Sequence, residues 1–141
     1  MRETTIKGSL LNSLRGIANS LPILFGVILL IGILSNLLTK DIYANIFTGN
    51  LLFDPLIGSV IGSISAGAPF ISYIFGGEML SQGVSLVAVT AFIISWVSVG
   101  VITLPVEAHF LGKRFSIIRN LLSFVFSIIV AIVTVLILQI I

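Results

Sequence analysis

The sequence contains no cysteine and one histidine, and only 9% of its 141 residues are charged. Without cysteine, disulfide bonds and thiolate metal sites are both excluded. A soluble domain carries about 25% charged residues, because its surface must face water. Here 57% of the residues are hydrophobic and the mean hydropathy is +1.26, so most of the surface must face lipid. The composition predicts a single all-α, multi-pass integral membrane domain over residues 1–141, located in the cell membrane.

The sequence also lacks a dense basic patch and any catalytic or metal-ligand pattern, which limits the classes of function. The net charge is only +2 and the basic residues are scattered among apolar segments, whereas a nucleic-acid surface needs a dense basic patch. We therefore expect no nucleic-acid partner. Metal-ligand spacings are missing and no nucleophile has an evident base, so we expect no enzyme, no catalytic residue, no metal and no cofactor. An intramembrane hydrolase built on Ser63, Ser65 and His109 is the enzymatic alternative.

Three apolar segments are long enough to cross the hydrocarbon core as helices, which takes about 20 residues. They are residues 16–38, 83–105 and 117–141. The first exceeds the apolar core of a cleavable signal peptide, about 7–15 residues, so we expect it to remain as an anchor. Before it, Ile6, Leu10 and Leu14 recur at helical spacing, which predicts an amphipathic interfacial helix over residues 4–15. An unstructured leader is the alternative.

Residues 55–80 are apolar but interrupted. Pro55 suits the first turn of a helix, and Pro69 disfavours helical geometry at the residue before it. We predict a broken helix whose interruption involves Gly62, Gly67, Gly76 and Gly77. Backbone groups freed at membrane depth persist only against protein or a wet cavity, and such discontinuous helices mark substrate and ion sites in secondary transporters. A glycine-rich packing kink in an ordinary span is the alternative.

The lysine and arginine counts compare two topologies for this segment, because cytoplasmic loops carry the excess. If residues 55–80 cross the membrane, three basic residues lie inside and four lie outside. If they form a re-entrant hairpin, six lie inside and Lys40 alone lies outside. Each half would be about ten residues, or about 15 Å, which reaches the bilayer middle. The charges favour three transmembrane helices plus a broken re-entrant helix over a four-span protein of dual topology.

A site at the break would bind a small solute or ion. Small residues recur every three or four positions along segment 83–105 and form one slightly polar stripe: Ser85, Ala88, Ala91, Ser95 and Ser98. Glu78 follows two glycines and is the carboxylate best placed to bind a cation or proton. A helix-packing face and an interfacial loop glutamate are the alternatives. The predicted substrate-binding residues are Ser63, Ser65, Gly67, Pro69, Ser72, Tyr73, Glu78, Ser95 and Ser98.

Two other groups have simpler expected roles. Asp54 directly precedes Pro55 and is expected to be the N-cap of a helix. Glu107 and His109 follow Pro105 at the end of a span near two basic residues, which favours interfacial salt bridging. We therefore include none of these three polar residues in the predicted site.

Three stretches resemble a known family: IGSISAGAPFISYIFGGEML, GVSLVAVTAFIISWVSVG and LPVEAHFLGKRFSIIRN. They are similar to the predicted permeases related to the YraQ-type and ArsP-type (organoarsenical efflux) proteins, over residues 55–120. The resemblance implies a polytopic permease built from two similar halves, of which this chain resembles one. Many members carry a Cys-Ser-Cys-Gly-like motif before a proline. Ser63 and Ser65 stand where those cysteines would be, with Pro69 as the proline, so a thiol-based arsenic site does not transfer.

One copy of such a unit would leave part of the broken backbone facing lipid, which is costly. A chain that resembles half of a permease is therefore expected to form a homodimer, or to pair with a second half-permease, within the lipid bilayer. The small faces at Gly58/Gly62 and Ala88–Ser98 offer surfaces for close helix contact. A non-transporting membrane scaffold or accessory subunit is the alternative function. The sequence names neither the substrate nor the coupling ion, and it leaves parallel and antiparallel pairing open.

Overall fold

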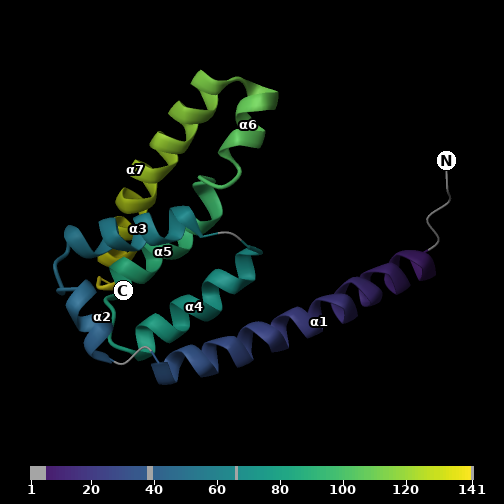
Figure 1. Ribbon diagram of the computed structural model, residues 1–141, viewed down its shortest axis with the longest axis horizontal. Helices are drawn as coiled ribbons and strands as arrows, with labels where there is room; N and C mark the ends of the chain where they lie inside the picture. Colours follow the sequence, from purple (N-terminus) through teal and green to yellow (C-terminus); the bar gives the residue numbers. More distant parts are fainter. Residues whose placement is uncertain (1–5, 38–39, 66, 141) are drawn as a thin grey trace. The chain divides into compact units, whose positions relative to one another are not determined.

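The computed structural model describes residues 6–37, 40–65 and 67–140, and within these ranges every regular element is a helix (Figure 1). The all-α prediction is therefore confirmed. Two described helices contain stretches long and apolar enough to cross a membrane, Gly8–Leu30 and Lys113–Leu138. The chain divides into two compact units, residues 1–36 and residues 37–141. The ends of three predicted segments, at Thr4, Leu38 and Ile141, lie outside the described residues.

The described residues of the first unit all belong to one helix, α1 (Ile6–Leu37), of 32 residues. It runs without interruption across the predicted boundary at residue 16 between an interfacial helix over 4–15 and a span over 16–38. Gly16 stands at that boundary, but a glycine inside a helix costs only about 1 kcal/mol relative to alanine. That cost is too small to end a long helix.

The second unit contains the remaining helices. They are α2 (Lys40–Ile46), α3 (Phe53–Ile64), α4 (Pro69–Ser81), α5 (Leu86–Ser98), α6 (Leu104–Leu111) and α7 (Lys113–Leu138). The segment predicted to be broken, 55–80, thus holds α3 and α4 with an interruption between them. Both α4 and α6 carry a proline in the first turn, where its missing N–H leaves no helical hydrogen bond unmade.

Glycine allows α3 to pack directly against α5. A Cβ added at Gly58 would collide with the carbonyl oxygen of Ala88, and one added at Gly62 would collide with the carbonyl oxygen of Phe92 and the hydroxyl of Ser95. Because the contacts advance together along both helices, α3 and α5 run in the same direction. Such close backbone approach is typical of small-residue helix interfaces in membranes.

Helix α4 runs in the opposite direction and also packs on α5 (Figure 1). Gly76, near the end of α4, lies against Ile93, whereas Gly67, just before α4, lies against Trp96. The chain therefore reverses its direction between α3 and α4. These two helices form a hairpin whose arms both pack on α5.

The helix predicted over 83–105 is interrupted in the structure. α5 ends at Ser98, Val99 is extended, and α6 begins only at Leu104. The backbone N–H of Gly100 donates to Oδ1 of Asn120 in α7 at 2.8 Å, in place of a helical carbonyl. Pro105 also lacks the N–H that a continuous helix would use. The side chain of Asn120 therefore stabilises an interruption that the apolar sequence of this segment did not predict.

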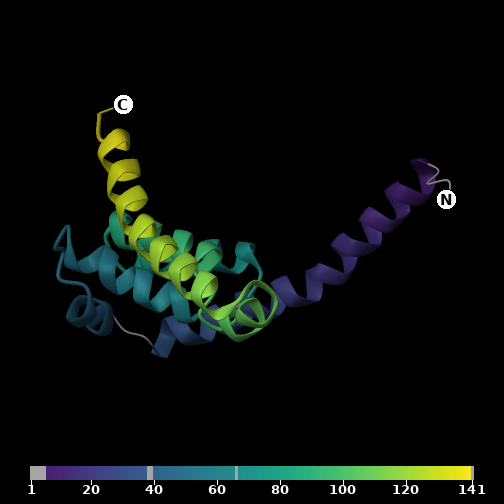
Figure 2. The same cartoon turned by 90° about the horizontal axis from the view of Figure 1, so that it is seen from above.

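Helix α7 crosses over α3 and α5 (Figure 2). It begins at Lys113 rather than at residue 117, directly after a turn at Gly112. Toward its end, Ala131 and Val135 pack with Val87 and Ala91 of α5. Near its start, α7 contacts α6. Taken together, α5, the interruption and α6 run antiparallel to α7.

Candidate functional site

Two interruptions lie side by side at one end of the α3–α5 pair. We call residues 65–68 the first break, of which Ala66 lies outside the described residues, and residues 99–103 the second break. They meet because α3 and α5 are parallel and end at the same level. A pocket of about 210 Å³ lies between them, which we call the break pocket. It is lined by Ser65, Gly67, Trp96, Val97, Val99, Gly100, Ile102 and Thr103.

The first break is stabilised by hydrogen bonds of Ser65 to the last turn of α3 and by one side-chain bond from α5. The N–H of Ser65 donates to the carbonyl of Gly62 at 3.1 Å, and its hydroxyl donates to the carbonyl of Ile61 at 2.7 Å. Gly67 has φ +154°, a conformation that residues with a Cβ rarely adopt. The indole Nε1 of Trp96 donates to the carbonyl of Gly67 at 3.3 Å, which links the break to α5.

Side chains from α6 and α7 stabilise the second break. Asn120 accepts from the N–H of Gly100 and donates through Nδ2 to Oε2 of Glu107 at 3.2 Å. The hydroxyl of Thr103 donates to Oε1 of Glu107 at 3.1 Å, and Nη2 of Arg119 lies 2.6 Å from both carboxylate oxygens. We call these five residues the Asn120 network.

Glu107 forms an ion pair, but its partner is Arg119 and not the nearby Lys113 or Arg114. The salt bridge predicted for His109 is not among the ion pairs of the described residues.

The structure brings Ser65 and Gly67 to the break pocket, and it places the other predicted serines inside helices. Their hydroxyls donate to carbonyls three or four residues earlier in the chain, so those protons are already used within the helix. These serines are Ser63, Ser72, Ser95 and Ser98. Substrate binding by these four serines stays a prediction, and Ser95 also provides the small surface that Gly62 packs against.

The remaining predicted residues lie along α4 and do not line the break pocket. Pro69 begins the helix, and Tyr73 is 61% exposed. Gly76 packs on α5, and nothing lies within 4 Å of a Cβ added at Gly77. Glu78 accepts a hydrogen bond from Nε2 of Gln82 at 2.8 Å. Because α4 runs away from the breaks, Glu78 lies at the opposite end of the unit.

A second pocket, of about 250 Å³, lies at that opposite end. It is lined by Tyr43, Phe47, Thr48, Gly49, Gln82, Gly83 and Val84. Burial raises the pKa of the Tyr43 phenol, and the negative charge of Glu78 raises it further. Glu78 thus acts electrostatically on Tyr43 of this pocket, near the end of α4 and away from the break pocket.

Asp54 has a different role from the predicted N-cap. α3 already begins at Phe53, and the Asp54 carboxylate is only 1% exposed. It accepts from the backbone N–H groups of Thr48 and Gly49 at 3.0 and 2.9 Å, and the hydroxyl of Ser85 lies 3.4 Å away. Asp54 therefore ties the loop before α3 to the start of α5. It fixes the register of the two parallel helices, and this register brings the two breaks together.

The break pocket is lined by backbone, by the hydroxyls of Ser65 and Thr103 and by the indole of Trp96, and these three side chains already donate hydrogen bonds within the protein. No group of three or more His, Asp or Glu among the described residues could hold a metal ion. Comparisons of this chain with protein families, curated proteins and solved structures found no match.

Proposed function

We propose that this protein is half of a membrane permease and that a small solute or ion passes through the break pocket. The observation that carries the proposal is the juxtaposition of two helix interruptions around a pocket of about 210 Å³. Discontinuous helices supply backbone groups and opposed helix termini to a substrate, and they do so at the sites of many secondary transporters. The resemblance to YraQ-type and ArsP-type permeases supports the same function.

The distribution of side chains supports a membrane setting. In the second unit the buried polar residues are Asp54, Ser59, Ser63, Ser72, Ser95, Ser116, Asn120 and Ser127. Large apolar side chains instead cover the outside of α7, where Leu121, Phe126 and Ile129 are about half exposed. An exposed apolar surface of this kind would be a liability in water and is the expected surface in lipid.

The helix lengths support the topology of three crossings and one re-entrant hairpin. α3, α4 and α5 have 12 or 13 residues, or about 18–20 Å each, which is little more than half of the hydrocarbon core. The α3–α4 hairpin would reach the bilayer middle and return. α5 and α6 would make one broken crossing beside α7, and α1 would make the third crossing. Both breaks then lie near the middle of the membrane.

We propose further that a second copy, or a second half-permease, closes the break pocket. Val97 and Ile102 line the pocket and are 55% and 56% exposed, so the described residues leave it open on one side. Freed backbone facing lipid is costly, and a protein surface over the opening removes that cost.

One observation favours a non-transporting scaffold as the second candidate. Gly58, Gly62 and Gly76 each serve close helix packing, and four of the predicted site serines bond within their own helices. If the first break likewise served packing alone, the unit would hold other membrane proteins together without moving a solute.

Flux into liposomes separates the two functions. The purified protein is reconstituted and uptake is measured for a panel of inorganic ions and small organic solutes. Gly67→Leu should abolish flux, because a side chain there meets Trp96 and Ile71 and the φ of +154° strains it. Gly77→Leu is the matched control and should retain flux, since that position is open. Wild-type protein that moves no solute, or Gly67→Leu protein that folds and transports normally, would favour the scaffold.

A further inference from the structure

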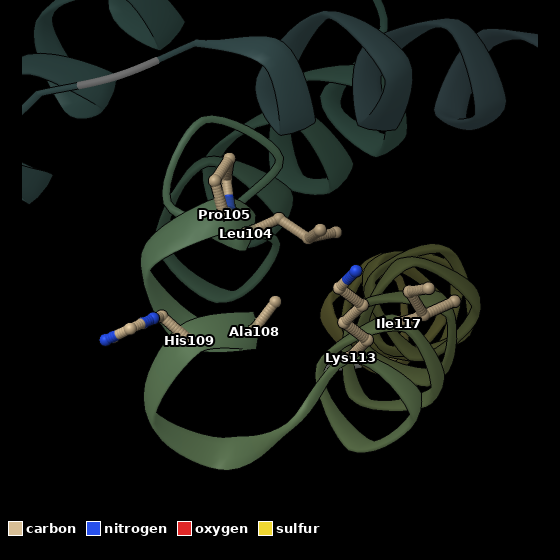
Figure 3. A pocket seen from close by; sticks show the side chains of 6 residues that line it. All are labelled: Leu104, Pro105, Ala108, His109, Lys113 and Ile117. Carbon is tan, nitrogen blue, oxygen red and sulfur yellow. The ribbon is translucent and has the colours of Figure 1, made fainter.

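A separate and larger pocket lies between α6 and the start of α7 (Figure 3). It has a volume of about 550 Å³ and is lined by Leu104, Pro105, Ala108, His109, Lys113 and Ile117. This volume is within the range of small-molecule sites, about 300–1,000 Å³. Apart from His109 and Lys113 the lining is apolar. The break pocket shares none of these residues.

The charge at this pocket is positive and unbalanced. The amine of Lys113 lies over the space between the two helices, whereas the ring of His109 points away from it (Figure 3). Lys113 and its neighbour Arg114 pair with no carboxylate among the described residues, because Glu107, the acidic residue of α6, is already bound to Arg119. An apolar space beside an unpaired cation is complementary to an anionic amphiphile.

We infer that this pocket binds an anionic phospholipid. Lys113 contacts the phosphate, and an acyl chain lies along Leu104, Ala108 and Ile117. The surrounding surface suits the membrane interface, since Val106 is 60% exposed and Phe110 is 79% exposed. In the proposed topology the α6–α7 turn is on the cytoplasmic side, where anionic lipids are enriched and basic pockets between helices bind their headgroups. The inference rests on the membrane setting proposed above but not on transport.

Native mass spectrometry tests the inference on the full chain released from nanodiscs of phosphatidylcholine and phosphatidylglycerol in equal amounts. The wild type should retain phosphatidylglycerol in preference to phosphatidylcholine. Lys113→Gln should reduce the retained phosphatidylglycerol about fivefold, the factor expected for one basic residue at a membrane surface. Ala108→Trp, which fills the pocket without changing charge, should reduce it at least as much. Circular dichroism and thermal melting verify that each variant is folded.

Arg15→Gln is the matched control, because it removes one positive charge from α1 and leaves the pocket intact. It should retain as much phosphatidylglycerol as the wild type. Equal losses in Arg15→Gln and Lys113→Gln would show general attraction to basic residues and overturn the inference. So would a wild type without lipid preference, unaltered binding in Ala108→Trp, or a crosslink between copies through Ala108→Cys that shows a second copy in the pocket. Solute flux does not enter these measurements, so this inference and the proposed function fail independently.

Discussion

The two breaks are built alike and stabilised differently. Each follows a helix of 12 or 13 residues, each begins with an extended residue, and each precedes a helix with proline in its first turn. The second break is bonded by the Asn120 network, which includes a carboxylate and a guanidinium. The first break is joined to α5 by one indole bond of 3.3 Å. Because side chains of α6 and α7 bond the second break at both Gly100 and Thr103, whereas one bond joins the first break to α5, we infer that the second break is the more rigid of the two.

This difference suggests that the two breaks have different roles in the proposed permease. A break that several side chains hold provides a fixed wall for the break pocket. A break that only one neutral hydrogen bond joins to a neighbouring helix can rearrange at lower cost when a solute enters or leaves. One variant disturbs the α3–α5 contact that brings the two breaks together, and the others weaken each break in turn.

The largest effect is expected where α3 meets α5. Gly62→Ala places a Cβ against the carbonyl oxygen of Phe92, and a backbone atom cannot move aside as a flexible side chain does. We expect a loss of about 3 kcal/mol in the free energy of unfolding, the upper end of the cost of overpacking. Gly77→Ala is the control and should leave stability unchanged or raise it by up to about 1 kcal/mol. Thermal unfolding in mild detergent measures both, and equal stabilities would contradict the close α3–α5 contact that brings the breaks together.

The first break was predictable from the sequence, and the second was not. The signals for the first are local, since Gly67 and Pro69 interrupt an apolar run within three positions. At the second, Gly100 and Pro105 are further apart, and the surrounding residues continue the apolar pattern. The side chain that replaces the helical hydrogen bond, Asn120, is 20 positions away along the chain. Only the packing of α7 beside α5 and α6 brings it into contact.

The site was predictable to a similar extent. Ser65 and Gly67 line the pocket because they belong to the first break itself. Glu78 does not line the break pocket, because α4 is a regular helix of 13 residues and places residue 78 about 14 Å from Pro69 along its axis. The hydrogen bonds of the helical serines Ser63, Ser72, Ser95 and Ser98 were not predictable either. The sequence does not show whether a serine hydroxyl bonds within its own helix or faces a ligand.

Loss of Asn120 should weaken the second break alone. Asn120→Ala leaves the N–H of Gly100 and one carboxylate oxygen of Glu107 without this partner, and a buried group left in that state costs about 1–3 kcal/mol. Hydrogen exchange should rise across residues 99–103 and stay unchanged across the first break. Gln82→Ala, which removes one amide–carboxylate bond at the other end of the unit, should cost less. Similar losses of unfolding free energy in the two variants would mean that the Asn120 network stabilises the protein no more than a single amide–carboxylate hydrogen bond does.

Loss of the indole N–H should weaken the first break at a smaller cost. Trp96→Phe keeps a ring against Phe75 and Phe92 but removes the donor to Gly67, so we expect a loss of about 0.5–1.5 kcal/mol. Hydrogen exchange should rise in the first turn of α4, where the N–H of Ile71 donates to the carbonyl of Ala68.

Phe92→Leu is the control for Trp96→Phe, because it removes a ring contact and keeps the indole bond. It should lower stability without raising exchange at the start of α4. If Trp96→Phe left that exchange unchanged, or raised it equally at both breaks, the contrast between the breaks would not hold.

The smallest effect is expected for Glu107→Gln, which removes the charge and keeps an oxygen acceptor. The side chains of Arg119 and Glu107 are 37% and 21% exposed, and partly exposed ion pairs contribute about 0–1 kcal/mol. Asn120 still accepts from Gly100 in this variant, so exchange across residues 99–103 should match the wild type. The small difference in unfolding free energy should shrink further from low to high salt, because salt screens the ion pair, whereas the loss in Asn120→Ala should not depend on salt. If Glu107→Gln costs as much as Asn120→Ala and raises exchange at the second break, the ion pair rather than the Asn120 amide holds that break in place.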